Sequence, residues 1–165
     1  MATYRSEHKT LPARIVLHKT SRYDDNESSG FQTAIEQHGI LDIDYLSIDH
    51  SLIRLYREGS NPPLRGTLAS LDSETHVLYT RGSVDFFRFY PGQYVPSPLL
   101  FRCEGTEQTP RFLAYELLAL TKMNWNPTQF DGHDPITIHA ARQVGSILRY
   151  LQDSDPIQPA YGYYM

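Results

Sequence analysis

The sequence predicts an α/β fold in which a mixed β-sheet is flanked by helices. Three observations lead to this prediction. The β-branched, apolar segment 13–18 has the composition of a buried strand, and a helix-like segment follows it before the next strand. Short strands with turn-like connections occupy the middle of the chain. Two amphipathic helices are expected after them, so helices and strands combine as in a layered α/β domain.

The first helix is expected over 29–38, because Phe31, Ala34 and Ile35 have helical spacing and form one apolar face. Apolar and polar residues alternate through much of 40–48, which predicts a half-buried strand. Further strands are expected at 53–56, 66–71, 76–80 and 86–90. The last three of these strands are separated by turn residues and suggest an antiparallel meander. Prolines between positions 91 and 98 predict an extended loop.

Two helices are expected near the C-terminus, over 111–123 and 135–151. The apolar positions with helical spacing in the first are Phe112, Tyr115, Leu118, Ala119 and Met123. The second has proline in its first turn and carries the stripe Ile136, Ala140, Val144, Ile147, Leu148 and Leu151. We divide the chain into a leader (1–11), one domain body (12–156) and an apolar tail (157–165).

Composition excludes several classes of protein. The chain has 165 residues, of which 40% are hydrophobic and 21% charged, as in globular domains. No apolar run approaches the roughly 20 residues of a membrane-spanning helix, and the N-terminus lacks a signal sequence, so a cytoplasmic setting is expected. The single cysteine, Cys103, excludes an internal disulfide and a cysteine-based zinc site. The net charge of −4 gives no sign of a nucleic-acid partner, although residues 1–23 are basic and 24–76 acidic.

Isolated acidic residues and histidines form no motif for catalysis. Asp42 and Asp44 share one strand face and, with Asp49, could bind a divalent cation, but a solvated strand face is the simpler interpretation. The seven histidines include no HExxH motif and no His/Cys cluster. His18, at the end of a buried strand, is expected to be a packed side chain, and His139 is expected to be a core or surface residue of the last helix.

Three polar, basic segments point weakly towards a polyanion. They are 18–22 where a strand meets a helix, 80–83 at a turn, and 121–126 at a helix end. Cationic, hydroxyl and amide groups of this kind bind phosphate oxygens. Each segment alone is non-specific, and a solvated surface is the simpler interpretation of each.

Taken in order along the chain, these segments resemble the PIWI domain of Argonaute proteins, and most closely its C-terminal part in long prokaryotic Argonautes. The resemblance runs from about residue 10 to the C-terminus. The segments that carry it are PARIVLHKTS (12–21), PLRGT (63–67), LYTRG (78–82), YPG (90–92), LTKMNWN (120–126) and PITIHAAR (135–142).

The resemblance implies an RNase H-like fold that holds a guide strand, of RNA or DNA, and its paired target. The residues that it places at nucleic-acid phosphates are Lys19, Arg22, Arg81, Lys122, Asn124, Asn126, His139 and Arg142. It also implies a Mg²⁺ ion near the 5′-phosphate of the guide, which the C-terminal carboxylate of Met165 approaches. Implied partners are an upstream MID/PIWI portion and an effector nuclease, in host defence against foreign DNA.

Active members of this family cut the target with two metal ions held by carboxylates. Here Thr20 stands where active members have an aspartate, and Arg142 stands at the fourth ligand position. A neutral hydroxyl poorly replaces a carboxylate, and a guanidinium repels a metal ion. We therefore expect no catalytic residue and no nuclease activity. The family's first aspartate and its glutamate-bearing loop would lie upstream of this sequence, so we expect a C-terminal fragment or one part of a split protein.

Two alternatives remain open. The chain could be an interaction module that pairs through an exposed sheet edge with an upstream chain and binds no nucleic acid alone. It could also be an unrelated hydrolase that uses Asp42, Asp44 or Asp49 with a metal ion, although these residues have no partner motif.

Overall fold

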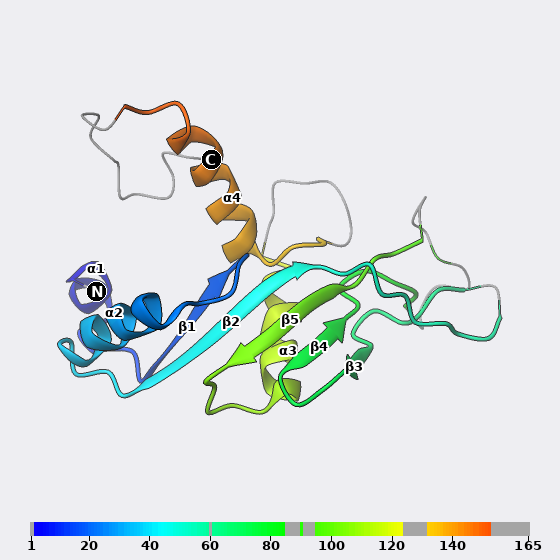
Figure 1. The fold of residues 1–165 in the computed structure, drawn as a ribbon, viewed down its shortest axis with the longest axis horizontal. Coiled ribbons are helices and arrows are strands. Elements are labelled where there is room, and N and C mark those ends of the chain that lie inside the picture. The colour runs from blue at the N-terminus through cyan, green and yellow to red at the C-terminus, as the bar shows by residue number, and fades with distance from the viewer. Residues whose placement is uncertain (1, 60, 85–89, 91–94, 124–131, 153–165) are drawn as a thin grey trace.

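The computed structural model describes residues 2–59, 61–84, 90, 95–123 and 132–152. Its centre is a five-stranded sheet with the order β1-β2-β5-β4-β3 (Figure 1). The strands are β1 (Arg14–Lys19), β2 (Asp42–His50), β3 (Leu68–Ser70), β4 (Thr75–Leu78) and β5 (Leu99–Glu104). Strands β1 and β2 are parallel, whereas every other neighbouring pair is antiparallel. The predicted mixed sheet flanked by helices is therefore confirmed.

Helices lie on both faces of this sheet. They are α1 (Ala2–His8), α2 (Asp25–Glu36), α3 (Pro110–Leu120) and α4 (Ile136–Leu148). Helix α2 connects β1 to β2, as expected for a parallel pair, and α3 covers the opposite face (Figure 1). Helix α1 lies in the segment 1–11 that we assigned as a leader, for which no helix was predicted. Among the described residues, no helix is long and apolar enough to cross a membrane.

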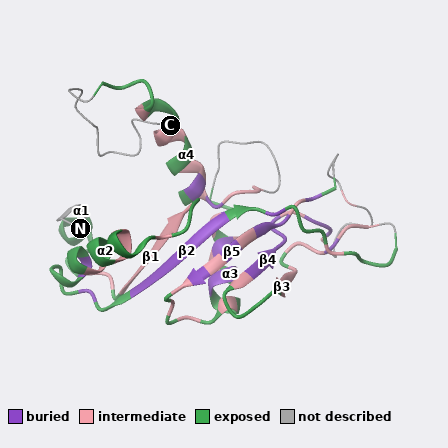
Figure 2. Cartoon of the chain, in the orientation of Figure 1, coloured by how far each residue is buried: buried purple, intermediate pink, exposed green. Residues whose placement is uncertain are grey.

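Strand β2 separates two apolar cores because its side chains alternate between the two faces of the sheet. Ile43 and Tyr45 join Ile35 of α2 in the smaller core. Leu46 and Ile48 face the larger core, which also contains side chains from β4, β5, α3 and α4. Figure 2 shows the result, with buried residues concentrated along β2, β5 and α3. Burial of apolar residues on both faces stabilises this strand although it contains three aspartates.

Helix α2 begins four residues earlier than predicted because a capping box fixes its N-terminus. The Asp24 side chain accepts a hydrogen bond from the Glu27 amide at 2.8 Å, and the Glu27 side chain accepts one from the Asp24 amide at 3.2 Å. Of the predicted apolar face only Ile35 is buried. Phe31 remains 42% exposed and packs edge-on against Tyr23.

The predicted apolar stripe of α3 was assigned to the wrong side of the helix. The side chains that enter the core are Leu113, Ala114 and Leu117. Phe112 and Tyr115, which belong to the predicted stripe, are 44% and 73% exposed. Both sides of α3 carry apolar residues, so their spacing alone could not show which side faces the sheet.

Strand β5 was missed, although it lies in the middle of the sheet. It follows the proline-rich segment that was expected to form only a loop, and it begins with consecutive apolar residues rather than a clear alternation. The meander prediction holds for β3 and β4, but the other neighbour of β4 is β5. The remaining member of that meander, 86–90, lies almost wholly outside the described residues.

The strand predicted at 53–56 is not formed. Its backbone amides bond to side chains instead of to a neighbouring strand: Ile53 N donates to Ser51 Oγ at 3.0 Å, and Leu55 N donates to Tyr79 Oη at 2.9 Å. Leu52, just before this segment, is 94% exposed. An apolar sequence without a strand partner does not become part of a sheet.

Helix α4 is confirmed close to its predicted range, but no residue of its predicted apolar stripe is buried. Ile138, which was not in that stripe, enters the larger core, whereas Ile147 and Leu151 remain 36% and 37% exposed. In Figure 1, α4 extends away from the sheet beyond its first turns. The predicted tail, 157–165, lies outside the described residues.

Candidate nucleic-acid interface

The candidate interface lies at the end of the sheet where β1, β2 and α4 meet. Because β1 and β2 are parallel, their carboxyl ends reach the same edge, and α4 begins there (Figure 1). His18 near the end of β1 is joined to α4, with its Nδ1 2.7 Å from Thr137 Oγ1. Burial lowers the pKa of His18 to about 4, opposed by Glu116 and assisted by Arg14. His18 is therefore a neutral packed side chain near pH 7, as expected.

Lys19 and Arg22 follow directly from this end of β1. The Lys19 ammonium forms an ion pair with Glu27 of the capping box and lies 5.3 Å from the centre of the Tyr23 ring. Its Nζ also donates to the Arg22 carbonyl at 3.3 Å. The Arg22 side chain is exposed. These contacts hold the Lys19 ammonium in place, three positions along the chain from the exposed Arg22.

Arg65 connects two further segments. Its Nε donates to the Thr80 carbonyl at 2.9 Å, and its Nη2 donates to Thr121 Oγ1 at 2.9 Å. A third bond, 3.2 Å long, reaches the Leu118 carbonyl at the end of α3. One guanidinium thus joins the turn that contains Arg81 to the helix end that contains Lys122. Lys122 is exposed and Arg81 is half-buried.

The segment before α4 packs against the same two places. Thr80 Oγ1 donates to the His133 carbonyl at 2.8 Å. A Cβ atom added to Gly132 would lie only 2.5 Å from the Thr121 carbonyl oxygen, so the two backbones are in close contact there. Segments near 80, 121 and 133, which are distant in sequence, therefore pack against one another beside the start of α4.

Arg142 belongs to a cluster with three other polar residues, Asp134, His50 and His133. Its guanidinium forms an ion pair with Asp134, and its Nη1 lies 3.5 Å from His50 Nε2. Asp134 Oδ1 lies 2.8 Å from His50 Nε2 and 3.2 Å from His133 Nδ1. Burial opposes ionisation of Asp134, but hydrogen bonds with His133 and His50 and the charge of Arg142 hold its pKa well below its usual range.

The other predicted site residues have mixed outcomes. His139 lies one turn into α4 and is half-buried. Asn124, Asn126 and Met165 lie outside the described residues, so the geometry does not bear on them or on a Mg²⁺ ion at the C-terminus. Thr20 is exposed just after β1 and offers only a hydroxyl. Arg142, at the position where the resemblance implies a fourth metal ligand, offers a guanidinium, which has no lone pair for a metal.

Sequence reasoning missed Arg65, His50, His133 and Asp134, which organise the surface. Arg65 was quoted only within a matching segment, and no spacing rule connects His50 with Asp134, 84 positions away. Only tertiary structure brings these side chains together.

The interpretation of Asp44 as part of a solvated strand face is wrong. Asp44 is 1% exposed and forms an ion pair with Arg14 on the neighbouring strand. Arg14 also makes a bidentate pair with Glu116 of α3, at 2.9 and 2.8 Å, and Asp44 accepts a hydrogen bond from the Glu107 amide at 2.9 Å. Asp42, on the same face, is exposed as expected. A carboxylate that already has these partners is a structural group.

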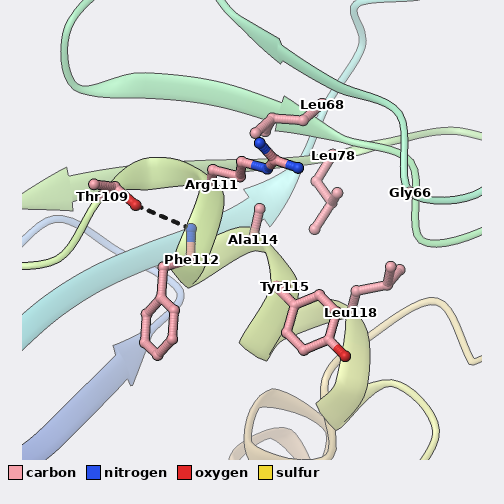
Figure 3. Close-up of a pocket in the computed structure, with 9 residues that line it drawn as sticks. All are labelled: Gly66, Leu68, Leu78, Thr109, Arg111, Phe112, Ala114, Tyr115 and Leu118. Carbon is pink, nitrogen blue, oxygen red and sulfur yellow. Dashed lines mark hydrogen bonds between the residues drawn. The ribbon is translucent and has the colours of Figure 1, made fainter.

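A cavity of about 580 Å³ lies between α3 and the β3–β4 hairpin. Figure 3 shows Phe112, Tyr115 and Leu118 on the outer side of α3, with Leu68 and Leu78 opposite. The exposed side of α3, including part of its mispredicted stripe, therefore lines an apolar hollow.

Comparisons with known proteins agree on the fold. No protein-family model matches the sequence, and no curated protein is similar to it in sequence. Among solved structures, Aquifex aeolicus Argonaute has a TM-score of 0.66 at 21% identity, over 94% of this chain and 21% of its own. Clostridium butyricum Argonaute bound to a guide DNA and a 19-mer target DNA has 0.67 at 17% identity, over 93% and 20%. Drosophila Piwi has 0.67 at 16% identity, over 89% and 22%.

This chain spans about a fifth of the length of these structures. The likeness covers most of the chain, including the mixed sheet and its flanking helices. The chain therefore has the α/β, RNase H-like fold of a PIWI domain, as found in Argonaute and Piwi structures.

Proposed function

We propose that this chain binds a guide strand paired with its target, as part of a catalytically inactive Argonaute of the prokaryotic type. The observation that carries this proposal is the convergence of the three basic segments. Segments containing Lys19, Arg81 and Lys122 meet α4 at one end of the sheet through hydrogen bonds of His18, Arg65 and Thr80. Cations spread over such a surface suit the repeating charge of a nucleic-acid backbone.

The fold supports the same proposal. Two of the similar solved structures carry nucleic acid, namely the Clostridium butyricum Argonaute with guide and target DNA and Aa-Ago with externally bound siRNA. In this chain Lys122 and Arg22 present exposed cations, and Arg142 is 40% exposed despite its ion pair. Sequence specificity would come from base pairing with the guide, because phosphate contacts alone carry no sequence information.

Fluorescence anisotropy tests this proposal directly. A labelled, 5′-phosphorylated single strand and its duplex are titrated with the chain at low and moderate salt. We expect binding that weakens as salt rises, because each phosphate contact releases counterions. Lys122→Ala and Arg22→Ala should each weaken binding and reduce the logarithmic salt slope on a single strand by about 0.7 for every phosphate that the variant leaves unneutralised. No binding by a folded, monodisperse sample contradicts the proposal for this chain.

Arg111→Ala is the matched control. Arg111 is an exposed arginine in the first turn of α3, whereas Lys122 follows the other end of that helix. Its removal changes the net charge equally but should leave binding and salt slope unchanged. A decrease in affinity equal to that of Lys122→Ala would mean that net charge, rather than this surface, causes the binding.

The proposed lack of nuclease activity rests on Thr20 and Arg142. Thr20 and Arg142 supply neither the carboxylate nor the lone pair that a two-metal site needs. We expect no cleavage of a guide-paired target with Mg²⁺ or Mn²⁺, and any cutting in the proposed defence role would belong to a partner nuclease. Metal-dependent cleavage that is abolished by a substitution in this chain contradicts this part of the proposal.

A second candidate function is an interaction module that pairs with another chain, such as an upstream MID/PIWI portion. The observation that favours it is the position of β1, which ends the described sheet with a neighbour on one side only. The backbone groups on the other side of β1 have no strand partner among the described residues, so this edge could pair with a strand of another chain. Size-exclusion chromatography of the isolated chain separates the candidates, because an obligate partner predicts oligomers or aggregates and no nucleic-acid binding.

A further inference from the structure

We propose that His50, His133 and Asp134 form a binding site for a divalent transition-metal cation, with zinc as the metal that the ligands favour. His50 is the last residue of β2, and the other two residues immediately precede Pro135 and α4. Their ligand atoms all lie within 4.8 Å of one another. The three residues are not those at which the resemblance implies catalytic ligands, although Asp134 contacts Arg142, which stands at one of those positions. The site requires no nucleic acid.

The spacing of the ligand atoms is close to that around a bound zinc ion. Asp134 Oδ1 lies 2.8 Å from His50 Nε2 and 3.2 Å from His133 Nδ1. Ligand atoms around a tetrahedral zinc ion, with bonds of about 2.0–2.1 Å, lie about 3.3 Å apart. The observed spacings are close to that value, so small side-chain movements would bring all three atoms into coordination. The three ligands would leave a fourth position for water.

The two ring nitrogens of His133 have different partners. Its Nε2 lies 2.9 Å from the Ser97 carbonyl oxygen, which can only accept, so Nε2 carries the proton. Nδ1 of the same ring faces Asp134 Oδ1 at 3.2 Å. A metal ion placed between these two atoms would gain a nitrogen and an oxygen ligand at once.

The Ser97 contact is also the arrangement that metal-binding histidines usually have. A histidine ligand typically donates its second N–H to a carbonyl or carboxylate, which fixes the ring and its tautomer. The backbone of His133 is fixed as well, by the hydrogen bond from Thr80 and by the close packing of Gly132 on Thr121. His133 is therefore held in position before any cation arrives.

The ligand chemistry selects the metal. Two imidazoles and one carboxylate suit Zn²⁺ and similar first-row ions, whereas Mg²⁺ and Ca²⁺ prefer all-oxygen sites. The His50 side chain is 49% exposed, so an ion can enter from solvent. Arg142 binds Asp134 through the other carboxylate oxygen, Oδ2, and leaves Oδ1 facing the histidines. Its positive charge opposes binding of a cation and should weaken the site.

Metal titration of the full 165-residue chain tests this proposal. Calorimetry with Zn²⁺ should show one ion bound per chain, and Co²⁺ should give the visible absorption of a tetrahedral complex. Excess Mg²⁺ should not displace either ion. His50→Gln and His133→Gln should each weaken binding at least about tenfold. His38→Gln, at an exposed histidine just beyond α2, is the matched control and should bind like the unmodified chain.

Arg142→Gln provides the sharpest variant, because it removes a nearby positive charge and no ligand. This variant should bind Zn²⁺ more tightly than the unmodified chain does. If the cluster serves only to hold the Arg142–Asp134 ion pair, the variant should gain no affinity for Zn²⁺. Circular dichroism of each variant distinguishes removal of a ligand from unfolding of the chain. The proposal is overturned if the unmodified chain binds no Zn²⁺, or if folded His50→Gln and His133→Gln variants bind it as tightly as the unmodified chain does.

Discussion

At the scale of single residues, the least expected feature is the buried charge of Asp44. A carboxylate that is 1% exposed in the middle of a sheet needs a partner, and Arg14 on the adjacent strand supplies it. Arg14 simultaneously reaches Glu116 of α3 and lies 5.3 Å from the centre of the Phe112 ring. The side chain therefore ties the edge strand to the helix that covers this face.

Arg14→Met should destabilise the chain by about 3 kcal/mol, because it leaves the Asp44 carboxylate buried without its counter-charge. Glu116→Gln should cost less than about 1 kcal/mol, since that partner is one-third exposed. Urea unfolding followed by circular dichroism measures both values. The double variant Arg14→Met with Asp44→Asn should recover part of the stability. If it is less stable than Arg14→Met alone, the unpaired charge is not the cause.

At the scale of elements, the sequence predicted individual strands and helices better than it predicted which strands lie next to one another. The β1 segment and the α4 boundaries followed from composition and proline placement. Strand β5 did not, because a central strand is stabilised by two neighbours that its own sequence does not reveal. The same limit applies to the interface. The basic segments were visible individually, whereas their convergence depends on Arg65, whose three acceptors lie on two other segments.

The close approach of two loops gives a test at this scale. A Cβ atom on Gly82 would lie 2.3 Å from the Pro63 carbonyl oxygen and 2.9 Å from the Arg65 amide nitrogen. Gly82→Ala must therefore separate the loops and strain the hydrogen bonds Arg65 N to Ser83 O, at 2.8 Å, and Ser83 N to Pro63 O, at 3.0 Å. We expect a decrease of about 2 kcal/mol or more in the free energy of unfolding.

Gly30→Ala is the matched control for this substitution. Gly30 lies inside α2 with nothing within 4 Å of an added Cβ atom, so alanine should stabilise the helix by about 0.5–1 kcal/mol. Thermal unfolding of the two variants should shift in opposite directions. Equal shifts would show that the loops can separate without cost.

At the scale of the whole molecule, the central strands of the sheet have more neighbours and are more deeply buried than its edge strand β1. Strand β5 lies between two neighbours and contains Phe101, which is fully buried. Strand β1 has one neighbour in the described sheet, and α4 enters the larger core through Ile138. The exposed positions of α4 in Figure 2 show how little of this helix is covered.

This asymmetry predicts the order of amide hydrogen exchange in the isolated chain. Amides of β5 and α3 should exchange slowest, because opening them requires disruption of the larger core. Amides of β1 that do not bond to β2, and those in the last turns of α4, should exchange fastest. Mass spectrometry of peptide fragments measures this order, and equal protection of β1 and β5 contradicts it. Protection of β1 that grows with protein concentration, while β5 stays constant, would indicate pairing of copies through the exposed edge.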